Sequence, residues 1–340
     1  MNDDRLKILF HPFASGLAAM PEDGRWLAAG IGAGLVLPQG FGARLHLVQG
    51  FRPGHDALAR AGFAVSPDWP DADPQGFDGA LILLGRHRGQ NEEWLRQALV
   101  RLKPGAPVIV AGGKTEGAQS FARRLKAALP GAVDSVAKHH GLAMWFDRPD
   151  DATVTRAFPE STPPSLVEGR YRTAPGMFSH DRVDAGSRLL ASCLPAGLSG
   201  RVADFCAGWG YLAAQVSGHC PKISALDLYE ADHAALEAAR RNLADVPVQV
   251  AFHWHDLAGE PVERRYDAIV MNPPYHTGRK AEPDLGRAMI RRAASALKPG
   301  GFLLMVANRQ LPYEGELAAS FAKVERLAEE GGFKVFLARR

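Results

Sequence analysis

The sequence contains two similar halves, and this repetition restricts the chain to a fold that can be built twice. Residues 29–32 (Ala-Gly-Ile-Gly) are matched by residues 207–210 (Ala-Gly-Trp-Gly). At the same spacing, residues 55–58 (His-Asp-Ala-Leu) are matched by residues 233–236 (His-Ala-Ala-Leu). In both halves, short apolar runs alternate with segments of helical periodicity, which is typical of a parallel sheet covered by helices. The repetition therefore predicts a duplicated α/β fold.

Apolar runs in the first half predict strands at residues 6–10, 45–48, 80–84 and 108–110. Helical periodicity predicts helices at residues 91–101 and 119–129. A later segment contains two adjacent aspartates and several prolines, which is a composition typical of a linker. We therefore expect a first domain over residues 1–147, a linker over 148–165 and a second domain over 166–340.

The second half begins with a strand, a glycine loop and a helix start over residues 202–212. Gly208 and Gly210 would let the backbone approach a ligand closely, and the start of a helix favours an anionic group. The next predicted strand ends in Glu230, about 20 residues after Gly210, a spacing suited to binding two ribose hydroxyls. Asp227 is a weaker candidate, because the predicted helix at residues 231–243 starts directly after Glu230.

The apolar run at residues 266–271 predicts a buried strand that stops at Asn272-Pro273-Pro274-Tyr275. The Asn272 side-chain oxygen and the free carbonyl of Pro273 can accept hydrogen bonds from an NH2 group. Tyr275 can stack on the ring that carries this amine. The motif predicts methyl transfer to a planar amine, with Asn272, Pro273, Pro274 and Tyr275 as catalytic residues. The alternative interpretation is a proline turn that ends a core strand.

The first half lacks the groups that would do this chemistry. Alignment of the repeats places Trp26 opposite Asp204 and Arg52 opposite Glu230. The counterpart of the proline motif falls in residues 83–88, which contain neither asparagine nor proline. We therefore expect the first half to be a degenerate copy without catalysis of its own.

Three further residues in the second half are candidates for ligand contacts. Asp256 follows a predicted strand at residues 248–254, and its carboxylate can accept a hydrogen bond from an adenine amine or serve as a turn or cap residue. Arg279 and Lys280 lie close to the proline motif and can bind phosphates. The pairs His139-His140 and His253-x-His255 lack a third ligand at a suitable spacing, so we expect no metal site.

The composition is compatible with a nucleic-acid partner. The chain of 340 residues has 46% hydrophobic residues, a formal net charge of +3 and an isoelectric point near 8.8. These values suit two cores and permit a polyanionic partner. The three cysteines have no disulfide or metal spacing, and no apolar run reaches membrane-spanning length. We therefore expect a cytoplasmic protein that acts as a monomer.

At this point the second half resembles a known family, the bacterial ribosomal RNA guanine-N2 methyltransferases, and most closely the small-subunit methyltransferase C family. Asn-Pro-Pro-aromatic motifs alone are shared with adenine-N6 and protein-glutamine methyltransferases, but the flanking segments narrow the resemblance. The segments that carry it are residues 175–179 (Pro-Gly-Met-Phe-Ser), 184–187 (Asp-Ala-Gly-Ser), the glycine loop, 272–276 (Asn-Pro-Pro-Tyr-His), 306–309 (Val-Ala-Asn-Arg), 311–313 (Leu-Pro-Tyr) and 333–335 (Phe-Lys-Val).

The resemblance implies two tandem Rossmann-like class I methyltransferase domains with mostly parallel seven-stranded sheets. It also implies that the degenerate first copy supports folding and RNA binding. The sequence departs from the family at Cys206-Ala207, where Gly-Cys is frequent, and at Glu230, where aspartate is usual. From spacing and resemblance together, the expected cofactor residues are Phe178, Asp204, Cys206, Gly208, Gly210, Asp227, Glu230 and Asp256. The expected RNA residues are His276, Arg279, Lys280 and Asn308.

The sequence therefore predicts S-adenosylmethionine-dependent methylation of a guanine N2 in ribosomal RNA, with 16S rRNA or the small ribosomal subunit as the partner. Alternative substrates are adenine N6, a large-subunit guanine and a protein glutamine, which also present a planar amine. A catalytically silent RNA-binding assembly factor is an alternative of another class. A nicotinamide dehydrogenase is a third possibility, because the glycine loop also fits a loose dinucleotide pattern.

Overall fold

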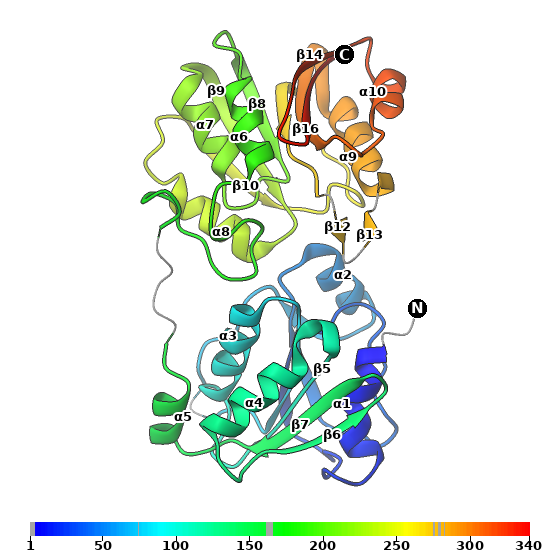
Figure 1. Cartoon of the computed structure of the whole chain (residues 1–340), viewed down its shortest axis with the longest axis vertical. Helices are drawn as coiled ribbons and strands as arrows, with labels where there is room; N and C mark the ends of the chain where they lie inside the picture. Colours follow the sequence, from blue (N-terminus) through cyan, green and yellow to red (C-terminus); the bar gives the residue numbers. More distant parts are fainter. Residues whose placement is uncertain (1–3, 74, 161–165, 275, 278–279, 282) are drawn as a thin grey trace. The chain divides into compact units, whose positions relative to one another are not determined.

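The chain forms two compact units, Met1–Pro163 and Pro164–Arg340. The computed structural model describes residues 4–73, 75–160, 166–274, 276–277, 280–281 and 283–340. Each unit has one seven-stranded sheet flanked by helices (Figure 1). Among the described helices, none has both the length and the apolar character needed to cross a membrane.

The first unit has a mixed sheet in which the parallel strands form the larger part. Its strands are β1 Arg25–Ala29, β2 Arg44–Val48, β3 Ala64–Ser66, β4 Gly79–Leu83, β5 Pro107–Gly113, β6 Asp134–Lys138 and β7 Gly141–Asp147. They are arranged in the order β3-β2-β1-β4-β5-β7-β6, with β7 antiparallel to both neighbours. The helices are α1 Asp4–Ala14, α2 Arg52–Arg60, α3 Arg88–Leu99, the 3-10 helix η1 Lys114–Glu116, α4 Ala118–Ala128 and α5 Asp151–Ala157.

The second unit repeats this arrangement. Its sheet strands are β8 Ser199–Phe205, β9 Lys222–Glu230, β10 Val250–Trp254, β11 Tyr266–Met271, β14 Leu297–Asn308, β15 Lys323–Glu330 and β16 Phe333–Arg339, and a separate pair is formed by β12 His276–Thr277 and β13 Lys280–Ala281. The sheet order is β10-β9-β8-β11-β14-β16-β15. The helices are α6 Ala185–Ser192, α7 Tyr211–His219, α8 His233–Asn242, α9 Pro283–Ala296 and α10 Glu314–Ser320.

The two sheets have the same topology, strand for strand, which confirms the predicted fold of two tandem Rossmann-like domains. The central strand β11 is buried along nearly its whole length and is mostly apolar in sequence, as expected for a strand covered on both faces. Residues of α6, α7 and α8 pack in one core on one face, and residues of α9 and α10 pack in another core on the opposite face. The carboxyl ends of β8, β9, β11 and β14 therefore meet at one edge of this sheet.

The helix that follows the first central strand is one of the differences between the two units. In the second unit, α7 connects β8 to β9, whereas residues 30–43 of the first unit, all of them described, contain no helix between β1 and β2. This segment is rich in glycine and contains Pro38, both of which disfavour a helix. The first unit therefore retains the sheet but lacks the glycine-loop helix.

A polar contact at the amino-terminal end of the central strands occurs in the first unit. Asp78, just before β4, accepts hydrogen bonds from the Arg25 backbone N–H at 2.8 Å and from Lys103 Nζ at 2.6 Å. The contact joins β1 and β4 to the segment that leads into β5. The hydrogen bond from Lys103 is the main reason that the pKa of Asp78 is lowered.

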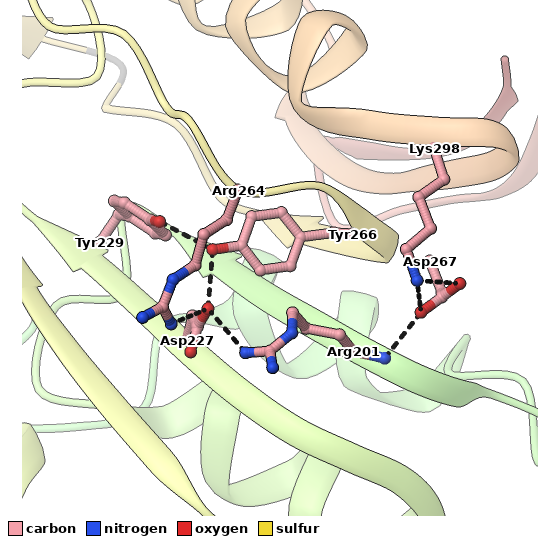
Figure 2. Close-up of polar contacts among 7 residues, drawn as sticks. All are labelled: Arg201, Asp227, Tyr229, Arg264, Tyr266, Asp267 and Lys298. Atoms are coloured by element: carbon pink, nitrogen blue, oxygen red, sulfur yellow. Dashed lines mark hydrogen bonds and ion pairs between the residues drawn. The ribbon is translucent and has the colours of Figure 1, made fainter.

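The second unit has the same contact at the same place in its sheet. Asp267 accepts from the Arg201 backbone N–H at 2.8 Å and from Lys298 Nζ at 2.8 Å (Figure 2). This pair of matching contacts supports the repeat that the sequence predicts. The strand register, however, places Gln49 and not Arg52 opposite Glu230, because Ala29 pairs with Val48 in the first unit and Phe205 pairs with Tyr229 in the second.

The predicted strand at residues 6–10 is wrong, because these residues belong to α1. Short apolar runs do not distinguish a strand from a buried helix, and here Leu6, Leu9, Phe10 and Phe13 are buried at helical spacing. The predicted linker at 148–165 contains α5, which is capped by the Asp150 carboxylate accepting the Thr153 N–H at 2.7 Å.

Candidate active site

The glycine loop makes a sharp turn between β8 and α7. Cys206, Gly208 and Gly210 have φ angles of 61°, 54° and 89°, in the left-handed region. A Cβ atom at Gly210 would lie 3.0 Å from the Ala239 side chain, so glycine also permits the close approach of α8. The loop thereby brings backbone N–H groups to the carboxyl edge of the sheet.

Glu230 ends β9 beside this loop. One carboxylate oxygen accepts the Gly208 N–H at 2.7 Å, and the other accepts the Asp232 N–H at 2.9 Å. Burial raises the pKa of Glu230 to about 7, although these hydrogen bonds act in the opposite direction. The carboxylate is therefore oriented at the edge where a ribose would lie in this fold.

Asp204 lies on β8 just before the glycine loop and is fully buried. Its Oδ2 accepts the Ala213 N–H at 2.9 Å, which holds the start of α7 against β8. Its Oδ1 has no hydrogen-bond partner in the described part of the chain. Burial raises the pKa of Asp204 well above its usual range. One buried acceptor is thus left over beside the loop.

Asn272 and the glycine loop lie in the same pocket. β8 and β11 are adjacent and parallel, with Phe205 opposite Met271, so the residues that follow them emerge side by side. The pocket is lined by Phe178, Ser179, Asp184, Ser187, Cys206, Ala207, Gly208, Trp209, Tyr211, Leu212 and Asn272. The structure thus brings together the predicted methyl-donor loop and the predicted amine-binding residue.

The side-chain amide of Asn272 is held from one side. Its Nδ2 donates to Asp184 Oδ2 at 3.1 Å and to Ser187 Oγ at 2.8 Å. Pro273 is buried and Pro274 is exposed. The sequence analysis assigned no role to Asp184 or Ser187, and the only available signal was the Asp-Ala-Gly-Ser segment of the resemblance.

The remaining part of the motif is only partly described. Tyr275 and Arg279 lie outside the described residues. For His276 and Lys280 the structure gives the backbone, in the antiparallel pair β12 and β13. Asn308 ends β14, and its side-chain oxygen accepts the Gln310 N–H at 3.0 Å.

Phe178 lies at the mouth of the pocket, and 64% of its surface is exposed. Its carbonyl accepts a hydrogen bond from Trp209 Nε1 at 2.9 Å, which anchors the backbone of this segment to the glycine loop. An exposed aromatic ring on an anchored backbone is available for stacking on a planar ligand.

Asp256 lies after β10, at the same edge as Glu230. The backbone of the two strands stays paired up to this point, because the His255 N–H donates to the Glu230 carbonyl at 2.9 Å. The Asp256 carboxylate accepts the Ala258 N–H at 3.0 Å, which is a turn contact. The turn leaves the second carboxylate oxygen of Asp256 available to another hydrogen-bond donor.

Asp227 lies on the other face of β9, in a separate network (Figure 2). Its Oδ2 accepts from the Tyr266 hydroxyl at 2.8 Å and from Arg264 at 3.0 Å, and Arg201 Nη1 lies 3.5 Å away. The Tyr266 and Tyr229 hydroxyls are 2.7 Å apart. This network occupies Oδ2 of the Asp227 carboxylate, on the face of β9 opposite to Glu230.

Comparison with known proteins identifies the family. The methyltransferase small domain model matches residues 168–337. A ribosomal RNA small subunit methyltransferase C of Escherichia coli is 35% identical over 267 residues, which cover 78% of this chain and 76% of that protein. The enzyme of the same name from Klebsiella pneumoniae is 32% identical over 269 residues, with 78% and 76% coverage.

A solved structure extends the similarity to the whole fold. The T. thermophilus 16S rRNA N2 methyltransferase RsmC, in complex with AdoMet and guanosine, superimposes with a TM-score of 0.79 at 24% identity. The superposition covers 99% of this chain and 92% of that one, so both units have counterparts there. The identity and coverage of the curated relatives show that this chain belongs to the ribosomal RNA small subunit methyltransferase C family.

Proposed function

We propose that this protein transfers a methyl group from S-adenosylmethionine to the N2 amine of a guanine in 16S rRNA. The observation that carries the proposal is that Asn272, at the end of β11, shares a pocket with the glycine loop. The named activity of the curated relatives supports the same reaction. Methylation of an adenine N6 or a protein glutamine uses the same motif, but family membership favours the ribosomal guanine.

The residues of the second unit fit the cofactor. S-adenosylmethionine supplies an electrophilic methyl group on a sulfonium and leaves as a neutral thioether. We assign its ribose hydroxyls to Glu230, whose carboxylate already lies against the glycine loop. The loop residues Cys206, Gly208 and Gly210 permit a close backbone approach, and the leftover oxygen of Asp204 can accept from a donor beside them. Phe178 and Asp256 are assigned to the adenine ring and its amine.

The proline motif acts on the guanine amine. The Asn272 Oδ1 and the Pro273 carbonyl accept the two N2 hydrogens, which favours a pyramidal nitrogen and frees its lone pair. No strong base is needed, because the proton can depart after the methyl group has transferred. Pro274 stiffens the turn, and Tyr275 stacks on the extruded base. His276, Arg279, Lys280 and Asn308 are assigned to neighbouring parts of the RNA.

The first unit is assigned a supporting role in folding and RNA binding. At the end of β4, where the second unit has its proline motif, the first unit has Arg86, His87 and Arg88, and all three are exposed. The two exposed arginines can neutralise phosphates, but they cannot accept the hydrogens of an amine for transfer. With ribosomal RNA as the substrate, we place the protein in the cytoplasm and expect it to act as a monomer.

The decisive test is analysis of ribosomal RNA from a strain that lacks the protein. Mass spectrometry of 16S rRNA nucleosides should show that one N2-methylguanosine is lost and is restored by the wild-type chain. An Asn272→Ala variant should fail to restore it, with transfer lowered at least about a hundredfold and cofactor affinity retained. An unchanged nucleoside profile would contradict the proposal, and restoration by Asn272→Ala would remove Asn272 from the reaction.

A further inference from the structure

We propose that Asp184 and Ser187 are positioning residues for methyl transfer, because they fix which end of the Asn272 amide faces the guanine. The inference rests on the proposed role of Asn272 as a hydrogen-bond acceptor for the amine. It concerns residues that do not themselves accept the amine hydrogens. Both line the pocket that contains Asn272.

Both hydrogens of the Asn272 amide nitrogen are bound by acceptors at the start of α6. Nδ2 lies 3.1 Å from Asp184 Oδ2 and 2.8 Å from Ser187 Oγ. An amide NH2 has two hydrogens, so these contacts satisfy it completely. The Oδ1 atom therefore points away from α6 and has no hydrogen-bond partner among the described residues. It is left as an acceptor in the pocket.

The negative charge of Asp184 excludes the opposite orientation of the Asn272 amide. A carboxylate can only accept hydrogen bonds, so the atom that faces Asp184 has to be the nitrogen. Rotation of the amide by half a turn would place Oδ1 against the carboxylate and would turn the NH2 group toward the substrate. A donor facing the guanine amine could not orient its hydrogens. Asp184 thus selects the orientation that methyl transfer requires.

The N-terminus of α6 holds the two acceptors, Asp184 and Ser187, rigidly. Asp184 is the N-cap residue of α6, and its Oδ2 accepts the Ser187 N–H at 2.8 Å. Ser187 is buried. A Cβ atom at Gly186 would lie 2.9 Å from the Phe333 ring, so glycine lets α6 lie directly on β16. The Asp-Ala-Gly-Ser segment therefore forms a rigid support behind Asn272.

The test compares variants of the full chain in methyl transfer to 16S rRNA. The double variant Asp184→Ala/Ser187→Ala should lower kcat about a hundredfold, because the acceptor is no longer held in one orientation. Ser187→Ala alone retains the helix cap and should lower kcat about tenfold. Asp184→Asn retains a cap oxygen but can present either a donor or an acceptor to Asn272, so the orientation is no longer selected and kcat should fall about tenfold. Cofactor affinity, measured by calorimetry, should stay within about twofold for all of them.

A matched control separates positioning from helix stability. Asp150→Ala removes the equivalent N-cap hydrogen bond of α5, 2.7 Å long, in the first unit. This variant should lose a similar amount of stability and keep wild-type kcat. The inference would be overturned if Asp150→Ala lowered kcat as far as the double variant, or if Ser187→Ala and the double variant were both as fast as wild type.

Two other outcomes also count against the inference. A loss of cofactor affinity that matches the loss of kcat would show that Asp184 and Ser187 contact the cofactor instead of positioning Asn272. An Asp184→Asn variant as fast as the wild type would show that the accept-only carboxylate does not select the orientation of Asn272. If the wild-type protein methylated no guanine of 16S rRNA, the proposed function would be overturned. That failure is seen with the wild type alone, whereas failure of the present inference is seen only when the variants are compared with an active wild type.

Discussion

The proposed contact of Glu230 with the ribose predicts that cofactor binding depends on pH. Its pKa of about 7 in the free protein, caused mainly by burial, means that a large part of the population is protonated at neutral pH. Ribose hydroxyls donate to the ionised carboxylate and so favour the deprotonated form. Cofactor affinity should therefore be constant above about pH 8 and should fall up to about tenfold per pH unit well below pH 7. Calorimetry in buffers of different ionisation enthalpy should also detect proton release on binding.

Two variants act as controls for this dependence. Glu230→Gln removes the titrating group, so affinity should be low and nearly independent of pH. Asp227→Asn changes a carboxylate that is held on the other face of β9 by Tyr266 and Arg264, and the pH dependence should remain. A wild-type cofactor affinity that does not change with pH would contradict the role of Glu230. Loss of the pH dependence in Asp227→Asn would assign the role to Asp227 instead.

Cys206 carries backbone strain that a glycine would avoid. Its φ of 61° is a conformation that glycine adopts without penalty. Cys206→Gly should therefore be more stable than Cys206→Ala by about 1 kcal/mol, since both remove the thiol but only glycine relieves the strain. Urea unfolding of the two variants measures this difference.

Cys193 provides the matched comparison for this pair of variants. Its φ is −95°, an ordinary conformation at the end of α6. There the order should reverse, and alanine should be more stable than glycine, because glycine loses more conformational entropy on folding. The strain argument for Cys206 fails if alanine is the more stable residue at both positions.

Local sequence patterns predicted two residues that lie beside the glycine loop in the structure. Glu230 was predicted from its spacing to the loop, and Asn272 from the prolines that end its strand. Asp184 and Ser187 were not found, because Ser187 lies 85 positions before Asn272 and no local pattern joins them. The contact exists only because α6 packs on the sheet beside the end of β11.

At the scale of elements, the repeated aspartate contact should stabilise both sheets. The pKa of Asp267 is lowered because the bonds from Lys298 and the Arg201 N–H outweigh the opposing effect of burial. Asp267→Asn and Asp78→Asn should each lower the free energy of unfolding by about 1 kcal/mol at neutral pH. A lowered folded pKa adds stability above the unfolded value of about 3.9 that is lost as pH falls through the folded pKa.

The difference between each variant and the wild type should therefore shrink in acid. Chemical unfolding at neutral pH and near pH 3, followed separately for each unit by a local probe, measures it. If the wild type and the two asparagine variants had equal stability at neutral pH, the contact would be a surface ion pair that does not contribute to stability.

The predictability of an element depended on how it is buried. β11 was predicted with its correct bounds, because both its faces are covered and its residues form one apolar run. β15 was not predicted, because this edge strand exposes most of its side chains and reads as a charged segment. The hairpin that it forms with β16 is determined by pairing between strands, which no local pattern reveals.

At the scale of the whole molecule, the two units have sheets of the same topology but differ in the groups that meet at the carboxyl edge of each sheet. Gln49 in the first unit occupies the position of Glu230, and its Oε1 accepts the Phe51 N–H at 2.9 Å just as Glu230 accepts from Asp232. The hydrogen bond to the loop has the opposite direction in the two units. Gln49 Nε2 donates to the Ile31 carbonyl at 2.7 Å, whereas Glu230 accepts from the Gly208 N–H. The loop of the first unit thus presents a carbonyl where the second presents an N–H.

This reversal predicts one cofactor site in each chain. Calorimetry of the wild type should give a stoichiometry of one, and Glu230→Ala should remove the measurable heat. Gln49→Glu should not create a second site, because its carboxylate would face the Ile31 carbonyl and no glycine-loop helix follows β1. It should instead destabilise the first unit by about 1–3 kcal/mol, the cost of an unsatisfied buried acceptor. A stoichiometry of two, in the wild type or in Gln49→Glu, would show that the first unit has kept its ligand.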